Sequence, residues 1–329
     1  MIANFFKKLF KIIKKKFKDF FALPNLKHHA IGFSIALGLL IIDLIVAYKL
    51  GYQTSHKRLY DAGPYAKLLI VVFLLYLFRL FVTNKKSSSD LVIVVYLFLL
   101  FWDVAYKVGW VHNDLLIPSP EGLFYVFKQD KSYLREMVWD SLQLLFWGFF
   151  LAIVSGTIIG LIVGWFARVR DVVLPISNAI TLIPPVLMTS WLIIWFPFKQ
   201  AAVAIIFLAV FWPTLQGMIQ RVGSIDKKVI DAARVMGVTN FGMLGKVIFP
   251  YCLPGIIISV SKSLRGAFMC LAGAEMIGIN GGIGFYTETF KAYADYRRVL
   301  AGIVTIGFMT TIIDILVHQV EKSVVKWRV

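Results

Sequence analysis

Residues 231–250 read DAARVMGVTNFGMLGKVIFP, a partly polar stretch that lies between two segments apolar enough to cross a membrane. Just before it, Ser224 or Asp226 can cap a helix that runs through KKVIDAARVM. Gly237 then stands where a left-handed residue commonly ends a helix. The pattern therefore predicts a short helix that ends in a turn at Gly237.

A second helix is expected after the turn, capped by Thr239 or Asn240. An apolar stripe at a spacing of three to four residues follows, formed by Phe241, Leu244, Val247 and Ile248. We expect Pro250 and Pro254 to end this helix before the next apolar segment. The result is a helix, a turn and a helix at a membrane surface, and the small Ala232 and Ala233 would let another surface approach closely.

The rest of the chain has the composition of an integral membrane protein. Of its 329 residues 59% are hydrophobic, and its mean hydropathy is +0.77, whereas ordinary soluble domains are about 45–50% apolar. The net charge of +17 indicates basic helix ends in contact with anionic lipid, not nucleic-acid binding. Cys252 and Cys270 indicate neither a disulfide framework nor a metal site, and the chain has no GxxxxGK[ST] phosphate-binding loop.

About 20 apolar residues are needed to cross the hydrocarbon core. Eight segments meet or approach this length, and they predict an all-α helix bundle with about eight transmembrane helices: 31–50, 65–83, 90–111, 141–166, 172–196, 200–220, 254–277 and 298–320. With both termini in the cytoplasm, the inner segments carry about twice as many Lys and Arg residues as the outer ones. This orientation also places residues 222–250 in the cytoplasm.

Residues 1–29 contain FFKKLFKIIKKKFKDFF, in which apolar and lysine positions alternate at helical spacing. Such a basic amphipathic helix lies on anionic lipid at the inner leaflet. A cleaved signal peptide fits less well, because the apolar run from Ile31 is long and has no clear small-residue cleavage site.

The polar stretch carries a family resemblance. Asp231-Ala232-Ala233, three residues, Gly237, nine residues and VIFP ending at Pro250 resemble the EAA loop of ABC importer permeases, E-A-A-x3-G-x9-I-x-L-P. Asp replaces Glu, Val replaces Ile and Phe replaces Leu, with the spacing unchanged. An amphipathic hairpin that only lies on lipid is the alternative interpretation.

Four further segments resemble the nitrate, taurine, aliphatic sulfonate and bicarbonate branch of these permeases: LIPSPEGLFYVF (116–127), ITLIPPVLMTSWLIIWF (180–196), GAEMIGINGGIGF (273–285) and DYRRVLAGIVTIGFMTTIIDIL (295–316). The resemblance covers about residues 90–329. Ser190 stands where the family commonly has Pro, and PFKQ after Phe196 replaces a usual Gly-containing turn. We therefore expect a six-helix permease domain over 86–329, two extra transmembrane helices over 30–85 and the interfacial helix over 1–29.

Family membership implies a permease that is not itself an enzyme, in a bacterial or archaeal cytoplasmic membrane. It implies a homodimer, with a heterodimer of permeases left open, two ABC ATPase subunits that bind ATP and Mg, and an extracytoplasmic substrate-binding protein. The residues implied in ATPase coupling are Asp231, Ala232, Ala233, Gly237 and Pro250. No cofactor is expected in this chain, and the cargo, small and anionic in this branch, is chosen mainly by the binding protein.

Polar groups at membrane depth are candidates for a translocation pathway. The fifth predicted span contains Asn178, Thr181, Pro184, Pro185, Thr189 and Ser190. These residues line a pore, or the prolines merely kink a packed helix whose hydroxyl groups bond to their own backbone. The sequence leaves both interpretations open.

The seventh predicted span contains charged residues. Lys262 and Arg265 face an anionic cargo, extend their charged ends to the membrane surface, or pair with Asp43 and Asp103, which lie inside their own predicted spans. Glu275, near the opposite end, is either a gate or a loop anchor. NGGIG (280–284) is too rich in glycine to remain helical, and it predicts a turn at the outer face.

Two other functional classes are possible from the composition alone. An ion channel or secondary transporter would explain the spans, but it gives no reason for the EAA spacing. A membrane-embedded enzyme needs a cluster of catalytic groups, and the sequence shows none at a common depth. The five histidines are scattered among loops and span ends: His28, His29, His56, His112 and His318.

Overall fold

The computed structural model describes residues 23–49, 61–83, 87–108, 110, 118–278 and 280–324. All regular structure in these ranges is helical, which confirms the predicted all-α class. The predicted interfacial helix over residues 1–29 lies mostly outside the described residues. The chain forms two compact units, Met1–Gln129 and Asp130–Val329.

The first unit contains α2 (Leu23–Lys49), α3 (Gly63–Thr83), α4 (Ser87–Lys107) and α5 (Pro120–Gln129). Its core joins apolar side chains of α2, α3 and α4. Two buried tyrosines form hydrogen bonds between α3 and α4. The Tyr96 hydroxyl donates to the Leu69 carbonyl (2.9 Å), and the Tyr76 hydroxyl hydrogen-bonds the Ser89 hydroxyl (3.0 Å). Helix α4, which lies within the predicted permease domain of residues 86–329, packs with α2 and α3 in this first unit.

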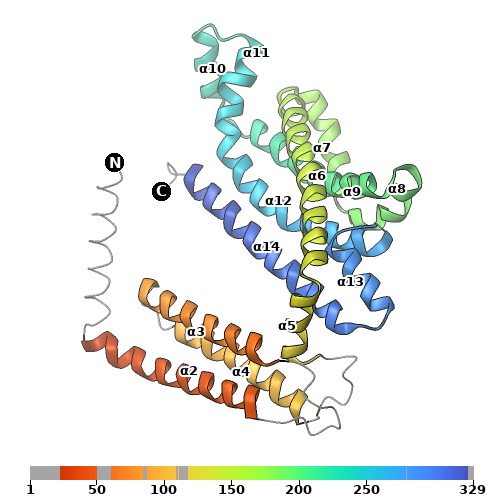
Figure 1. Ribbon diagram of the computed structural model, residues 1–329. Helices are drawn as coiled ribbons and strands as arrows, with labels where there is room; N and C mark the ends of the chain where they lie inside the picture. Colours follow the sequence, from red (N-terminus) through yellow and green to blue (C-terminus); the bar gives the residue numbers. More distant parts are fainter. Residues whose placement is uncertain are drawn as a thin grey trace. The chain divides into compact units, whose positions relative to one another are not determined.

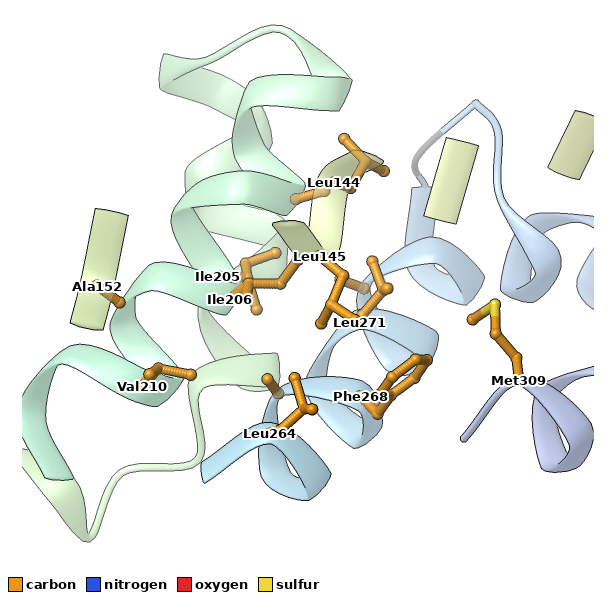
Figure 2. Close-up of a cluster of buried hydrophobic side chains, with 13 residues drawn as sticks. Leu144, Leu145, Ala152, Ile205, Ile206, Val210, Leu264, Phe268, Leu271 and Met309 are labelled. Carbon is orange, nitrogen blue, oxygen red and sulfur yellow. The ribbon is translucent and has the colours of Figure 1, made fainter. Parts of the chain in front are cut away.

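The second unit holds the remaining helices (Figure 1), which are α6 (Lys131–Trp165), α7 (Ala167–Thr181), η1 (Pro185–Met188), α8 (Thr189–Trp195), α9 (Phe198–Gly223), α10 (Lys227–Val235), α11 (Asn240–Gly242), η2 (Met243–Ile248), α12 (Phe249–Gly278), α13 (Ile283–Ala292) and α14 (Tyr296–Val324). In Figure 1, α10 and α11 form a hairpin at one end of α12, and α13 lies near the other end. Buried side chains of α6, α9, α12 and α14 meet in one core, in which Leu145, Ile206 and Leu271 lie close together (Figure 2).

Helices α6 and α9 approach each other closely because α6 carries a small residue at every fourth position: Gly148, Ala152, Gly156, Gly160 and Gly164. A Cβ atom built on Gly160 would lie 2.7 Å from the Cβ of Met218, and one on Gly148 would lie 2.7 Å from the Cβ of Ile206. Membrane helices have no water-driven burial to hold them together, so close backbone approach is a main source of their packing energy.

Seven described helices are long and apolar enough to cross a membrane, or up to eight if the bent pair α7 and η1–α8 counts as one span. This agrees with the predicted number. The span predicted over 172–196 is broken in the structure, and its two halves are bent by 80°. Pro184 and Pro185 have no backbone N–H and cannot continue the α7 hydrogen-bond ladder, so the chain breaks after Thr181 and resumes in the 3-10 turn η1.

The expected helix end at Pro250 and Pro254 is also wrong, since the chain stays helical from Asn240 to Gly278 through α11, η2 and α12. The η2 segment is a π-helical turn. A proline removes one donor and crowds the carbonyl four residues before it, and for Pro250 that residue, Lys246, lies in the wider turn. The π-helical turn thus lets the hairpin continue rigidly into α12.

Candidate functional site

The hairpin formed by α10 and α11 is capped at each end of α10. The Asp226 side chain accepts a hydrogen bond from the Lys228 N–H (2.9 Å). Gly237 has φ +77°, its N–H donates to the Arg234 carbonyl (2.9 Å), and the Val238 N–H donates to the Ala233 carbonyl (3.2 Å). These two bonds form the Schellman motif expected at a helix end with a left-handed glycine, which confirms the predicted turn.

The second half of the hairpin begins with Thr239, whose side chain accepts from the Gly242 N–H (3.2 Å). Ala233, buried to 3% exposure, anchors α10 in a small core formed with Met218, Val222, Ile225, Met243, Ile248, Cys252 and Ile256. The two alanines therefore differ, because Ala233 packs inside the hairpin and Ala232 is exposed. The hairpin is fixed to α9 and α12 by apolar contacts.

The outer end of the hairpin is apolar and open to its surroundings. Val235, Met236 and Phe241, which we call the hairpin tip, are 89%, 76% and 91% exposed. Asp231 and Pro250, the other residues implied in coupling, are also exposed. Exposed apolar groups at the end of a rigid element are typical of a protein interaction site.

Most polar side chains of the broken span form hydrogen bonds within the protein. The Thr181 hydroxyl donates to the Ser177 carbonyl (2.7 Å) and the Thr189 hydroxyl to the Val186 carbonyl (2.6 Å). Asn178 Oδ1 accepts a hydrogen bond from Gln216 Nε2 on α9 (2.8 Å). The back-bonding alternative therefore describes the two threonines, while Ser190 is exposed.

Two of the predicted lining residues, Thr181 and Pro185, do face a cavity of about 400 Å³ between the broken span, α9 and α12. Trp212, Gly266 and Cys270 complete much of its mostly apolar wall. The other predicted residues of this span, Asn178, Pro184, Thr189 and Ser190, do not line this cavity.

The structure separates Lys262 from Arg265. Arg265 Nε donates to Asp314 Oδ1 on α14 (2.8 Å), a partner outside the alternatives considered from the sequence. Asp103 instead pairs with Lys107 (2.9 Å), four residues later on the same helix. Lys262 has no ion pair among the described residues and lines a second cavity.

This second cavity has a volume of about 580 Å³ and lies between the ends of α9 and α12 nearest the hairpin. Arg221 and Lys262 supply two positive charges, and Ser224, Tyr251 and Ser259 add polar groups. The Arg221 guanidinium donates to the Ser259 hydroxyl. Sequence reasoning missed Arg221 because it directly follows an apolar segment, where a basic residue is ordinary at the cytoplasmic end of a membrane helix. Arg221 and Lys262 are too far apart in the sequence to form a recognisable motif.

Glu275 is an anchor for the glycine-rich turn. It is almost fully buried, and its two oxygens accept from the Ser141 hydroxyl (2.6 Å) and the Gly284 N–H (2.8 Å). Ser141 also accepts from the Ile283 N–H (3.0 Å). Gly281 and Gly282 have φ values of 129° and 91°, which confirms the predicted turn, and this geometry fits the loop-anchor alternative.

A neighbouring ion cluster was also missed by sequence reasoning. Arg298 bridges Asp130 (2.6 Å) and Asp295 (2.8 Å), and the Tyr286 hydroxyl donates to Asp130 (2.8 Å). The cluster fastens α13 and the start of α14 to the start of α6. Residues 130 and 298 are too far apart in sequence for a motif to join them.

Comparisons with known proteins agree with this architecture. Residues 152–326 match the family model described as binding-protein-dependent transport system inner membrane component. The chain is 24% identical to the taurine transport system permease protein TauC of Escherichia coli over 74% of this chain and 91% of TauC. It is 27% identical to SsuC of Bacillus subtilis, a candidate aliphatic sulfonates transport permease, over 69% of this chain and 83% of SsuC.

Among solved structures, the MetNI methionine ABC transporter in inward-facing conformations shares the fold, with a TM-score of 0.52 at 20% identity. The match covers 58% of this chain and 95% of the MetNI chain. The family model covers more than half of the present chain. The chain therefore belongs to the binding-protein-dependent transport system inner membrane components, the multi-pass permease subunits of ABC transporters.

Proposed function

We propose that this permease carries a small anionic solute of the sulfonate, taurine or nitrate class into the cell. An extracytoplasmic binding protein delivers the solute, and two ATPase subunits drive transport through the α10–α11 hairpin. Two copies of the chain form the pathway, with both termini in the cytoplasm. The ATPase subunits bind ATP and Mg, and this chain itself contains no GxxxxGK[ST] phosphate-binding loop.

The observation that carries the proposal is the rigid hairpin with its exposed apolar tip. Caps at Asp226 and Gly237 fix α10, and the anchor at Ala233 fixes α10 to the bundle. An apolar, well-ordered projection of this kind can seat in a groove of a partner protein. A flexible tether would transmit little force, whereas two capped helices move as one body.

Motion of the hairpin would reach the candidate pathway through α12. The hairpin continues into α12 without a break in helical structure from Asn240 to Gly278. Gly266 and Cys270 of α12 line the apolar cavity, and Gly255, Ser259 and Lys262 line the polar one. A rigid movement of α10 and α12 would therefore change the walls of both cavities.

An anionic cargo is supported by the charge of the polar cavity and by the relatives. Arg221 and Lys262 face the cavity, and no carboxylate is among its lining residues. Planar guanidinium and flexible ammonium groups both bind sulfonate-like oxygen anions through charge-assisted hydrogen bonds. The relatives TauC and SsuC are named for taurine and aliphatic sulfonates.

Docking of the hairpin tip is tested by Phe241→Ser. Because Phe241 is 91% exposed, we expect the variant permease to keep its thermal stability. We also expect its affinity for the cognate ATPase subunits to fall about tenfold or more, as for the loss of a large apolar anchor. The matched control is Phe308→Ser on α14, which is 61% exposed and distant along the chain from the hairpin.

The measurement is co-purification and binding of the ATPase subunits, followed by uptake in vesicles. Unchanged ATPase binding by Phe241→Ser would contradict docking through this tip. Uptake that persists in vesicles without any ATPase subunit would instead indicate a channel or secondary transporter.

A further inference from the structure

The first unit contains a cluster of buried charged groups that lies outside the residues matched by the permease family model, 152–326. The cluster consists of Asp43 on α2, Asp103 and Lys107 on α4 and Glu121 on α5. Each of these residues is no more than 2% exposed. Charged side chains this deeply buried in a membrane protein are costly, and they commonly serve a function.

Lys107 is the centre of the cluster. Its ammonium group lies 2.9 Å from Asp103 Oδ2 and 3.0 Å from Glu121 Oε1, and it donates to the Val46 carbonyl on α2 (2.9 Å). These three contacts account for the three hydrogens of the ammonium group. The lysine joins α2, α4 and α5 in one polar contact.

Asp43 takes part in none of these three Lys107 contacts. Neither of its carboxylate oxygens has a hydrogen-bond partner in the described part of the chain. The buried Tyr65 hydroxyl, which interacts electrostatically with Asp43, Asp103 and Glu121, also has none. Tyr96, which interacts electrostatically with Asp43, donates its own hydroxyl hydrogen to Leu69 on α3.

Lys107 is already in contact with Asp103 and Glu121. An ionised Asp43 would therefore be a buried carboxylate with no hydrogen-bond partner in the described part of the chain. An unpartnered buried carboxylate is far less stable than the neutral acid, so such a group takes up a proton or binds a cation. No group of three or more His, Cys, Asp or Glu in the described ranges could hold a metal ion.

We propose that this cluster is a proton-binding site in which Asp43 holds an exchangeable proton. Asp43 interacts electrostatically with Tyr65 from α3 and with Tyr96 and Asp103 from α4, and Lys107 from α4 joins Asp103 to Glu121 from α5. Loss of the proton places a buried negative charge on Asp43, beside the carboxylate of Asp103. The packing of α2, α4 and α5 in the first unit therefore responds to pH, independently of the proposed transport function.

Infrared spectroscopy of the purified full-length protein tests the proton directly. We expect the absorption of a protonated carboxylic acid at neutral pH, and we expect Asp43→Asn to lose one such group. Asp43→Glu, which retains an acid, should shift the absorption. The matched control is Asp90→Asn on α4, at an exposed position, which should leave the absorption unchanged. An acid absorption that is the same in wild type, Asp43→Asn and Asp43→Glu would overturn the proposal.

The pH dependence of thermal stability is the second readout. Because burial favours the neutral acid, the wild-type melting temperature should fall as the pH rises from mildly acidic to alkaline. The fall should be smaller in Asp43→Asn and unchanged in Asp90→Asn. Exchange of sodium for choline at alkaline pH should have no effect. A sodium-specific stabilisation that Asp43→Asn abolishes would overturn proton binding and identify a sodium site.

Discussion

At the scale of single residues, the hairpin depends on one backbone conformation. Gly237 has φ +77°, and a Cβ atom added there would meet no atom within 4 Å. Any penalty for a larger residue therefore comes from the backbone and not from crowding. A β-branched residue in the left-handed region costs about 1–3 kcal/mol, which is enough to disturb the turn between α10 and α11.

Gly237→Val is expected to uncouple ATP hydrolysis from transport. The valine strains the Schellman turn, so α10 loses its fixed orientation relative to α12. The measurement is ATPase activity of the reconstituted complex, with and without loaded binding protein, together with uptake. The control is Gly245→Ala, where an added Cβ also meets nothing within 4 Å but no left-handed backbone is required. Full stimulation by loaded binding protein in Gly237→Val would count against this role.

At the scale of secondary-structure elements, the second unit depends on the close contact between α6 and α9. The small residues of α6 recur every four positions and bring its backbone against Ile206, Met218 and Val222 of α9. The same two helices contribute most of the core around Leu145 and Ile206 (Figure 2). The contact supports the cavities, because α9 supplies Trp212 to one and Arg221 to the other.

Gly160→Val should separate α6 from α9. The new Cβ would lie 2.7 Å from the Met218 Cβ and 2.9 Å from the Leu215 carbonyl oxygen, and the backbone atom cannot move aside cheaply. We expect destabilisation of about 1–3 kcal/mol, as for other overpacked sites, seen as a lower melting temperature in detergent. Gly307→Val on α14 is the control, since no atom lies within 4 Å of its added Cβ. Equal melting temperatures for the two variants would exclude the close contact as the cause.

At the scale of the whole molecule, the family match and the charged cluster around Lys107 belong to different units. Residues 152–326, which match the family model, lie in the second unit together with the hairpin and both cavities. The first unit contains the cluster around Lys107 and Asp43. Substitutions at Lys262 therefore test the second unit, and substitutions at Asp43 test the first.

Uptake measurements on Lys262 test the charge of the proposed pathway. Lys262→Glu places a carboxylate in the polar cavity beside Arg221, and we expect uptake of a sulfonate-like anion to fall about tenfold or more, because reversing a nearby charge costs over about 1.4 kcal/mol. The control is the swap Arg265→Glu with Asp314→Arg, which preserves the ion pair outside the cavity and should retain uptake. Normal uptake by an assembled Lys262→Glu complex would remove the anion pathway at this site.

The sequence by itself determined the membrane class, the approximate number of helices and the capped turn at Gly237. These features are local, since they depend on apolar length, on capping side chains and on residue spacing. The EAA spacing also led to the permease family, which the family model confirmed. No partner across the bundle was needed for any of these predictions.

Only the tertiary structure decided which distant groups meet. Arg265 pairs with Asp314, and Glu275 bonds Ser141, 134 positions away along the chain. The tertiary structure also showed that the span at Pro184 bends by 80° and that α12 runs through Pro250. Hydropathy does not distinguish the faces of an apolar helix, because lipid and protein neighbours are both apolar. The helix register and packing therefore decide which buried charges find a partner.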